Sequence, residues 1–256
     1  MDLALPTKGL EKYHSGSQIA RVATEAWAAK NLFCVGCQSS RLRAFRAGTK
    51  ARDYFCPNCD VPVQLKSQSR PFGRRIVDSA YESMMAAIAS DHAPHFVLLH
   101  YTRETWSVVD LTFIPNFAIP ESAIEKRKPL SPTAERANWV GCNVLLCQVP
   151  IDARIPIVEN GRIVSRELVR RALRRIRPLA ELKSEQRGWT LDVLTAVRQL
   201  ERSDFLLGDV YAKETELSRL HPSNRHVRDK IRQQLQVLRD KGLLEFLGGG
   251  RYRLVD

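Results

Sequence analysis

Hydrophobic and polar positions repeat with two different periods along this chain, and each change of period marks a new element. Apolar residues spaced three or four apart predict an amphipathic helix over residues 17–33 and a second helix over residues 79–90. Elsewhere in the first half, period-two alternation and short apolar runs are typical of strands. We expect a turn at residues 47–50 and strands at residues 41–45, 51–55, 63–67, 95–102 and 106–114.

The region that follows predicts a hairpin and then a strongly basic helix. Asn160-Gly161 stands between two apolar runs within residues 155–165, which favours a type I′ turn. Ser165 then caps a helix that ends at Pro178. One face of this helix is a run of arginines. Such a charged face is usually just solvated, but the scarcity of acids near this one favours contact with a phosphate backbone. The helix carries Arg166, Arg170, Arg171, Arg174 and Arg175.

Residues 189–256 predict a small module of helices followed by a hairpin. Ser223 caps its longest helix and Gly242 ends it. This order resembles a winged helix, in which the longest helix enters a DNA groove. Such modules sometimes bind protein, but the basic helix here favours DNA. We expect elements at residues 190–201, 206–220, 224–241, 243–247 and 251–255. We expect DNA contacts from Arg225, Arg228, Arg232, Gln233 and Arg251.

Composition narrows the class of partner. The chain has 256 residues, which is enough for one sizeable core and a smaller second domain. Its net charge of +12 and pI near 9.7 favour a polyanionic partner, nucleic acid before membrane, because no long apolar run accompanies the charge. The first residues lack the pattern of a signal peptide, so we expect a cytoplasmic protein. The polar stretch 179–188 is the expected linker between domains at residues 1–182 and 183–256.

Two Cys-x-x-Cys pairs stand between the first helix and the third strand. They are Cys34 with Cys37 and Cys56 with Cys59, and each short loop places two thiolates on one side of a metal ion. Four cysteine ligands leave no coordination position for water, so a zinc ion here is structural. The alternatives are four unliganded thiols or two disulfides, and a reducing cytoplasm disfavours the latter.

An acid, an amide and a lysine lie on the strands that flank the second cysteine pair. Side chains two apart on a strand share a face, so Gln64 and Lys66 point the same way while Leu65 points to the core. Pairing of neighbouring strands can bring Asp53 beside them. Such a set can hold a hard divalent cation against a phosphate, with the lysine orienting or activating the attacking water. The alternative is an ordinary surface hairpin with scattered polar residues.

The order helix, three strands, helix, strand resembles the α/β core of PD-(D/E)XK nucleases, with Asp53 as the acid and Gln64-x-Lys66 in the (D/E)-x-K position. The cysteine knuckle between these strands, the segment from Arg127 to Asn143 and the C-terminal module together resemble the DpnI family of methyl-directed restriction endonucleases. The resemblance covers nearly the whole chain. It implies a bacterial or archaeal type II enzyme that cleaves GATC sites carrying N6-methyladenine with Mg²⁺. It also implies that Asp53, Gln64 and the backbone carbonyl of Leu65 hold the Mg²⁺, with Lys66 as a catalytic residue.

One departure from the motif leaves a second function open. Position 64 carries an amide where the motif has a second carboxylate, so Mg²⁺ should bind less tightly than with glutamate. The alternative is therefore a catalytically weak or inactive regulator that binds methylated DNA. An HNH-type zinc nuclease needs a histidine close to its cysteine pairs, and none lies between His14 and His92.

Two further segments are candidates for DNA contact. The basic loop after Lys66 carries Arg70, Arg74 and Arg75, which either contact phosphates or simply face solvent. The segment around Trp139 is rich in proline and cations. An N6-methyl group presents an apolar surface in the major groove, where an indole can contact it as apolar side chains contact the thymine methyl. We expect Trp139 to make this contact, the alternative being a core tryptophan. We expect a monomer that binds adenine-methylated double-stranded DNA.

Overall fold

A computed structural model describes residues 1–46 and 52–255 of the chain, so the turn expected at residues 47–50 lies outside the described residues. The chain forms two compact units that alternate along the sequence. The first unit comprises residues 1–73, 93–116 and 154–173, and the second comprises residues 74–92, 117–153 and 174–256.

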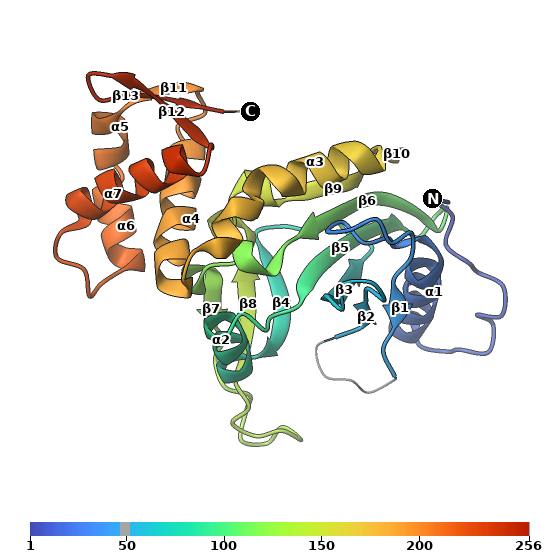
Figure 1. Cartoon of the computed structure of the whole chain (residues 1–256). Coiled ribbons are helices and arrows are strands. Elements are labelled where there is room, and N and C mark those ends of the chain that lie inside the picture. Colours follow the sequence, from blue (N-terminus) through green and yellow to red (C-terminus); the bar gives the residue numbers. More distant parts are fainter. Residues whose placement is uncertain (47–51, 256) are drawn as a thin grey trace. The chain divides into compact units, whose positions relative to one another are not determined.

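The first unit contains a seven-stranded sheet with the helix α1 (Gly16–Asn31) packed on it (Figure 1). The strand order is β1-β2-β3-β5-β6-β9-β10, in which β3 and β5 are parallel and the other neighbours are antiparallel. Thr24 on α1 contacts Ser67 on β3 through their hydroxyl groups at 3.0 Å. The strands are β1 (Arg43–Ala44), β2 (Tyr54–Phe55), β3 (Pro62–Gln68), β5 (His95–Thr102), β6 (Ser107–Ile114), β9 (Ile155–Glu159) and β10 (Arg162–Ile163).

Apolar alternation places the core of the first unit on the central strands. Phe96 and Leu99 on β5 and Leu111 on β6 are almost completely buried, as is Trp27 on α1. The β9–β10 hairpin turns at Asn160-Gly161 with positive φ at both residues, 48° and 72°, which confirms the expected type I′ geometry. These strands fix the position of β3, and β3 carries the candidate active-site residues.

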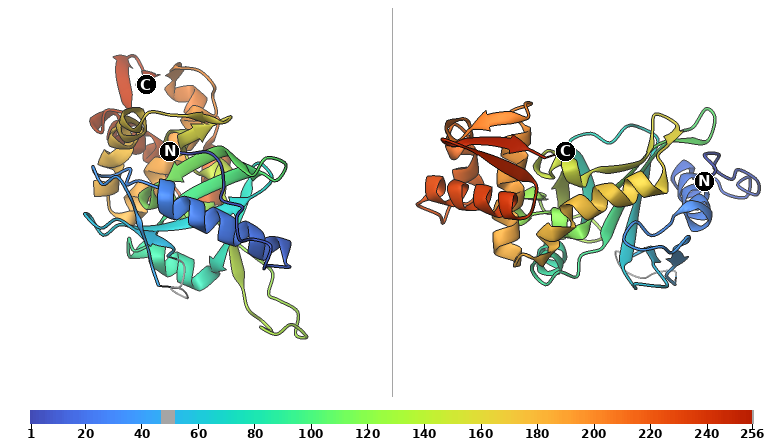
Figure 2. Two further views of the ribbon diagram at one scale, coloured as in Figure 1. Left: turned by 90° about the vertical axis from the view of Figure 1, so that its right-hand side faces the viewer. Right: turned by 45° about the horizontal axis from the view of Figure 1, so that its top comes forward.

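The second unit begins with a three-stranded antiparallel sheet of order β4-β8-β7 and the helix α2 (Figures 1 and 2). Ile76 and Val144 point to the buried face of this sheet, whereas Val77 is 60% exposed on the opposite face. The segment between β7 and β8 extends away from the sheet in Figure 1 and in the left view of Figure 2. The elements are β4 (Arg75–Ala80), α2 (Tyr81–Ala89), η1 (Asn116–Ala118), η2 (Glu121–Ala123), β7 (Ile124–Lys126), β8 (Gly141–Leu145), η3 (Leu146–Gln148) and η4 (Ile151–Ala153).

The rest of the second unit is helical and ends in a small sheet of order β11-β13-β12 that lies against α7 (Figure 2). Helix α3 runs from residue 166 in the first unit to residue 176 in the second. The bounds are α3 (Arg166–Ile176), η5 (Arg177–Glu181), α4 (Ser184–Arg198), β11 (Asp204–Leu206), α5 (Leu207–Tyr211), α6 (Glu214–Leu220), α7 (Val227–Asp240), β12 (Leu244–Gly248) and β13 (Arg251–Leu254). The helices from α4 to α7 followed by the β12–β13 hairpin are the winged-helix arrangement expected from the sequence.

Several expectations were wrong in detail. Arg75, expected in a loop, and residues 79–80, expected in the second helix, belong to the strand β4, because residues 75–80 pair with β8, a partner about seventy residues later in the chain. The stretch 179–188, expected to link the two domains, holds the end of η5 and the start of α4, and the expected domain boundary stays a prediction. The helix α7 begins at Val227 and is not capped by Ser223, because the Asn224 side chain accepts a hydrogen bond from the His226 N–H at 2.8 Å and holds the preceding residues in a turn.

Candidate active site and metal centre

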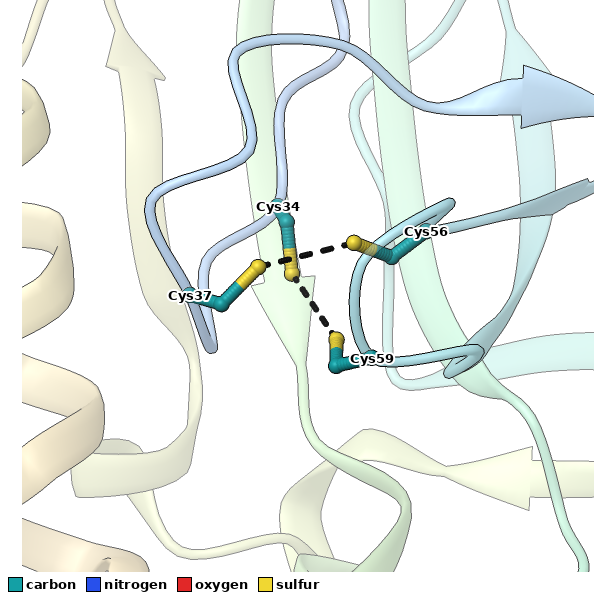
Figure 3. A group of neighbouring side chains, drawn as sticks. All are labelled: Cys34, Cys37, Cys56 and Cys59. Atoms are coloured by element: carbon teal, nitrogen blue, oxygen red, sulfur yellow. Dashed lines mark hydrogen bonds between the residues drawn. The ribbon is translucent and has the colours of Figure 1, made fainter.

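Four thiols converge where the chain leaves α1 and where it leaves β2 (Figure 3). The sulfurs of Cys34, Cys37, Cys56 and Cys59 all lie within 4.8 Å of one another. Two of the separations are 3.6 Å (Cys34 to Cys59) and 3.5 Å (Cys37 to Cys56). Tetrahedral zinc with bonds of about 2.3 Å separates its sulfurs by about 3.8 Å, whereas a disulfide requires about 2.05 Å. The cysteines are free, and their arrangement is compatible with zinc.

Backbone amides support the ionised form of this cluster. The N–H of Asn58 donates to the Cys56 sulfur and that of Ser39 donates to the Cys37 sulfur, both at 3.4 Å. Burial opposes ionisation of Cys56, but N–H groups of the knuckle and neighbouring thiols lower its pKa to about 6. Burial raises the pKa of Cys34. One thiolate is therefore favoured before a metal arrives, and the others lose their protons when it binds.

An arginine on α3 forms hydrogen bonds with the loop that carries Cys34 and Cys37. The Arg170 guanidinium donates to the Gln38 side chain at 3.0 Å and to the Cys34 carbonyl at 3.4 Å, and it lies over the Phe33 ring. A zinc ion with four thiolates carries a net charge of −2, which a neighbouring guanidinium offsets. Sequence reasoning missed this role, because the arginine run of α3 indicated a face open to phosphate. Arg175 is also engaged, in an ion pair with the buried Asp152.

Asp53 is held against the middle of β3. Its backbone N–H donates to the Val63 carbonyl at 3.0 Å, and its carbonyl accepts from the Phe45 N–H at 2.9 Å. Its carboxylate Oδ2 accepts a hydrogen bond from the Leu65 N–H at 2.7 Å. Leu65 stands between Gln64 and Lys66, so the structure brings the three sequence-predicted residues to one short stretch of β3.

Gln64 is nearly buried, with 9% of its surface exposed, and its Oε1 has no hydrogen-bond partner among the described residues. A buried acceptor without a partner costs about 1–3 kcal/mol. Leu65 is only half-buried, so the expectation that Leu65 points to the core while Gln64 and Lys66 share the other face was wrong about which face is buried. Val63 and Gln64 point to opposite faces of β3 and are both buried, so both faces are covered at this level. A buried oxygen without a partner among the described residues, next in the chain to the residue that holds the Asp53 carboxylate, fits a hard divalent cation.

Lys66 lies on the Gln64 side of β3. Its Nζ is 5.9 Å from the centre of the Phe96 ring, and Phe96 is the register partner of Gln64 on β5. The lysine side chain therefore reaches back along the strand toward the amide.

A second carboxylate lies close to this stretch. The hydroxyl of Tyr54 donates to the backbone carbonyl of Glu25 at 2.8 Å. Burial raises the pKa of Tyr54, and the negative charges of Glu25 and Asp53 raise it further. Glu25 also pairs with Arg21 at 3.4 Å. Both carboxylates are therefore close enough to Tyr54 for their charges to act on its hydroxyl.

The candidate DNA-contact residues fall into three groups. Three form ion pairs within their own unit: Arg75 with Glu125 at 2.9 Å, Arg228 with Glu214 at 2.8 Å and Arg232 with Asp229 at 2.9 Å. Trp139 is half-buried, which differs from both a free surface ring and a fully buried core residue. The remaining candidates are exposed: Arg70, Arg74, Arg225, Gln233 and Arg251.

Two family models match the chain. The Dam-replacing (DpnI) family matches residues 1–182, and the Dam-replacing HTH domain matches residues 185–254. The chain belongs to the Dam-replacing family. Membership in the Dam-replacing family makes the chain a DNA-binding nuclease for methyl-dependent restriction of Dam-modified DNA, and nucleases of this kind use a divalent metal. None of the described helices is both long and apolar enough to cross a bilayer.

Proposed function

We propose that this protein is a type II endonuclease that cleaves double-stranded DNA at GATC sites carrying N6-methyladenine and that requires Mg²⁺. The observation that carries the proposal is the buried Oε1 of Gln64, which has no partner among the described residues, next in the chain to Leu65, whose N–H holds the carboxylate of Asp53. A fold retains an orphaned buried acceptor when another role offsets its cost, and metal ligation is such a role.

Each residue has a distinct part in the proposed hydrolysis. Asp53, Gln64 and the Leu65 carbonyl would hold the Mg²⁺, which supplies Lewis-acid polarisation of the scissile phosphate. Lys66 donates hydrogen bonds toward the attacking water and offsets the negative charge that develops on the phosphate. A zinc ion in the cysteine cluster would fix the end of the β2–β3 ribbon and so keep the distances among Asp53, Gln64 and Lys66 constant.

Methyl recognition is proposed for two places. Trp139 presents an indole to the N6-methyl group, which is apolar and lies in the major groove. The winged helix adds a second contact with the same site or with another copy of it, through Arg225, Arg228, Arg232 and Gln233 of the helix region and Arg251 of the wing. Arg70, Arg74 and Arg75 contact phosphates.

The deciding experiment compares a GATC-containing plasmid with and without adenine methylation, incubated with zinc-loaded protein and Mg²⁺ and scored for fragments. We expect fragments from the methylated plasmid only. Lys66→Ala should abolish cutting while its binding to a methylated duplex stays within a few-fold of wild type. Lys30→Ala, an exposed lysine on α1, removes the same charge and should cut normally.

Two outcomes separate the alternatives. Tight binding to methylated DNA without nicking by the wild-type protein, in Mg²⁺ or Mn²⁺, would make it a regulator that has lost catalysis through Gln64. Cutting by Lys66→Ala at the wild-type rate would remove Lys66 from the mechanism.

A further inference from the structure

The backbone of Trp139 is held on both sides in the segment that joins β7 to β8. The Trp139 carbonyl accepts a hydrogen bond from the Leu130 N–H at 2.9 Å, and the Trp139 N–H donates to the Arg136 carbonyl at 3.1 Å. Asn138 adopts a positive φ of 62°, which turns the chain just before the indole. The Cα of Trp139 is thus fixed, and only its two side-chain torsions set the direction of the ring.

Gly141 on β8 lies against the outer edge of the ring. A Cβ on residue 141 would be 2.7 Å from both Cη2 and Cζ3 of Trp139 and 3.4 Å from Nη1 of Arg127. Favourable carbon–carbon contacts are about 3.5–4.0 Å, so any side chain at this position displaces the ring by about 1 Å. The strand pairing is firm here, since the Arg127 N–H donates to the Gly141 carbonyl at 2.9 Å.

The ring lies on the uncovered face of the β4-β8-β7 sheet. Side chains two apart on a strand share a face, so Gly141 shares a face with Asn143. Asn143 pairs with Val77, which is 60% exposed, and with Glu125. Glu125 accepts hydrogen bonds from Asn143 at 2.7 Å and from Arg75 at 2.9 Å, so its charge is offset. With the charge of Glu125 offset, this face and the cationic segment between β7 and β8 favour binding of a polyanion.

We propose that Gly141 is a positioning residue for methyl recognition, because only a residue without a Cβ lets the outer edge of the Trp139 indole come this close to β8 and so sets the direction in which the ring faces the methyladenine. The proposal rests on the proposed role of Trp139. The atoms that a Cβ would meet form the outer edge of a side chain with two torsions, so Gly141→Ala turns the ring instead of unfolding the strand.

The test measures binding of zinc-loaded protein to matched methylated and unmethylated GATC duplexes without Mg²⁺, so that no cleavage occurs. Gly141→Ala should reduce the ratio of the two dissociation constants by about tenfold and leave the constant for unmethylated DNA within about twofold. Gly16→Ala is the matched control, because a Cβ there meets nothing within 4 Å, and it should change neither constant. Near-ultraviolet circular dichroism should change for Gly141→Ala and not for Gly16→Ala.

Trp139→Ala separates the two proposals. If Trp139→Ala loses methyl discrimination and Gly141→Ala keeps it, the positioning role is overturned and the reader role stands. If Trp139→Ala keeps discrimination, the indole is not the reader and both proposals fail. An equal loss of affinity for the two duplexes in Gly141→Ala would mean that glycine serves only the fold.

Discussion

Replacing Gln64 by methionine tests the candidate metal site without any DNA. Methionine has nearly the same length and volume but no amide, so Gln64→Met removes a buried acceptor that has no partner among the described residues. An unsatisfied buried acceptor costs about 1–3 kcal/mol, and the 9% exposure of Gln64 leaves water little chance to satisfy it. We expect the free energy of unfolding of the Mg²⁺-free protein to rise by about 1–2 kcal/mol. Each kcal/mol should raise the melting temperature by about 2–4 °C.

The assay is chemical and thermal unfolding in a buffer that contains zinc and no chelator, because a chelator would also strip the cysteine cluster. Added Mg²⁺ should then stabilise the wild type by about 1.4 kcal/mol at ten times its dissociation constant and leave Gln64→Met unchanged. The matched control is Gln68→Met on the same strand. The Gln68 amide donates to the carbonyls of Arg70 and Pro71 at 2.9 and 3.0 Å, so its loss should destabilise the protein.

Two results would refute the metal-ligand role of Gln64. The first is a Mg²⁺-free Gln64→Met protein that is less stable than wild type, which would mean that the amide already has a structural partner. The second is equal stabilisation of wild type and variant by Mg²⁺, which would place the cation elsewhere.

Three other changes give distinct results. Gln64→Glu should bind Mg²⁺ more tightly yet be less stable without it, because a buried carboxylate then lacks its counterion; calorimetric titration with Mg²⁺ and unfolding in its absence measure the two effects. Cys56→Ser should lower the zinc content and unfold the first unit, as measured by metal analysis and circular dichroism, whereas Cys147→Ser, outside the cluster, should do neither. Burial lowers the pKa of His95 to about 4, so the unfolded chain takes up a proton below pH 6.5 that the folded chain excludes, and stability should fall by about 2 kcal/mol between pH 7 and pH 5. His95→Asn, which keeps an acceptor for the Asn116 N–H, should lack this loss. The free energies of unfolding of the wild type and the variant are measured by denaturant titration at each pH, and the same pH dependence in both would contradict the assignment to His95.

Local signals in the sequence predicted local structure well. The Asn160-Gly161 turn and the positive φ of Gly242 after α7 follow from residue chemistry within a few positions, and the structure confirms both. The cysteine cluster was predictable for the same reason, because two short loops each fix two thiols. The pairing of β2 with β3 could also be predicted from the sequence, and its register places Asp53 beside Leu65.

Features that depend on distant partners were not predictable. The strand β4 exists because β8 pairs with it, and nothing within residues 75–80 indicates that partner. The burial of Gln64 depends on the pairing of β3 with β5, a strand about thirty residues later in the chain. Arg170 looked like part of an open basic face until the fold placed the knuckle beside it.

The amide at position 64 has a physical rationale in the charges that already surround it. Glu25 and Asp53 both raise the pKa of Tyr54, so their negative fields overlap before any third acid is added. A carboxylate with 9% exposure would join that field at a high desolvation cost and would repel Asp53 whenever the cation is absent. In the proposed site an amide would provide the ligand oxygen without that charge, which predicts a more stable metal-free fold and a lower affinity for Mg²⁺ than a glutamate would give. Cleavage should therefore respond steeply to Mg²⁺ concentration in the wild type and far less in Gln64→Glu.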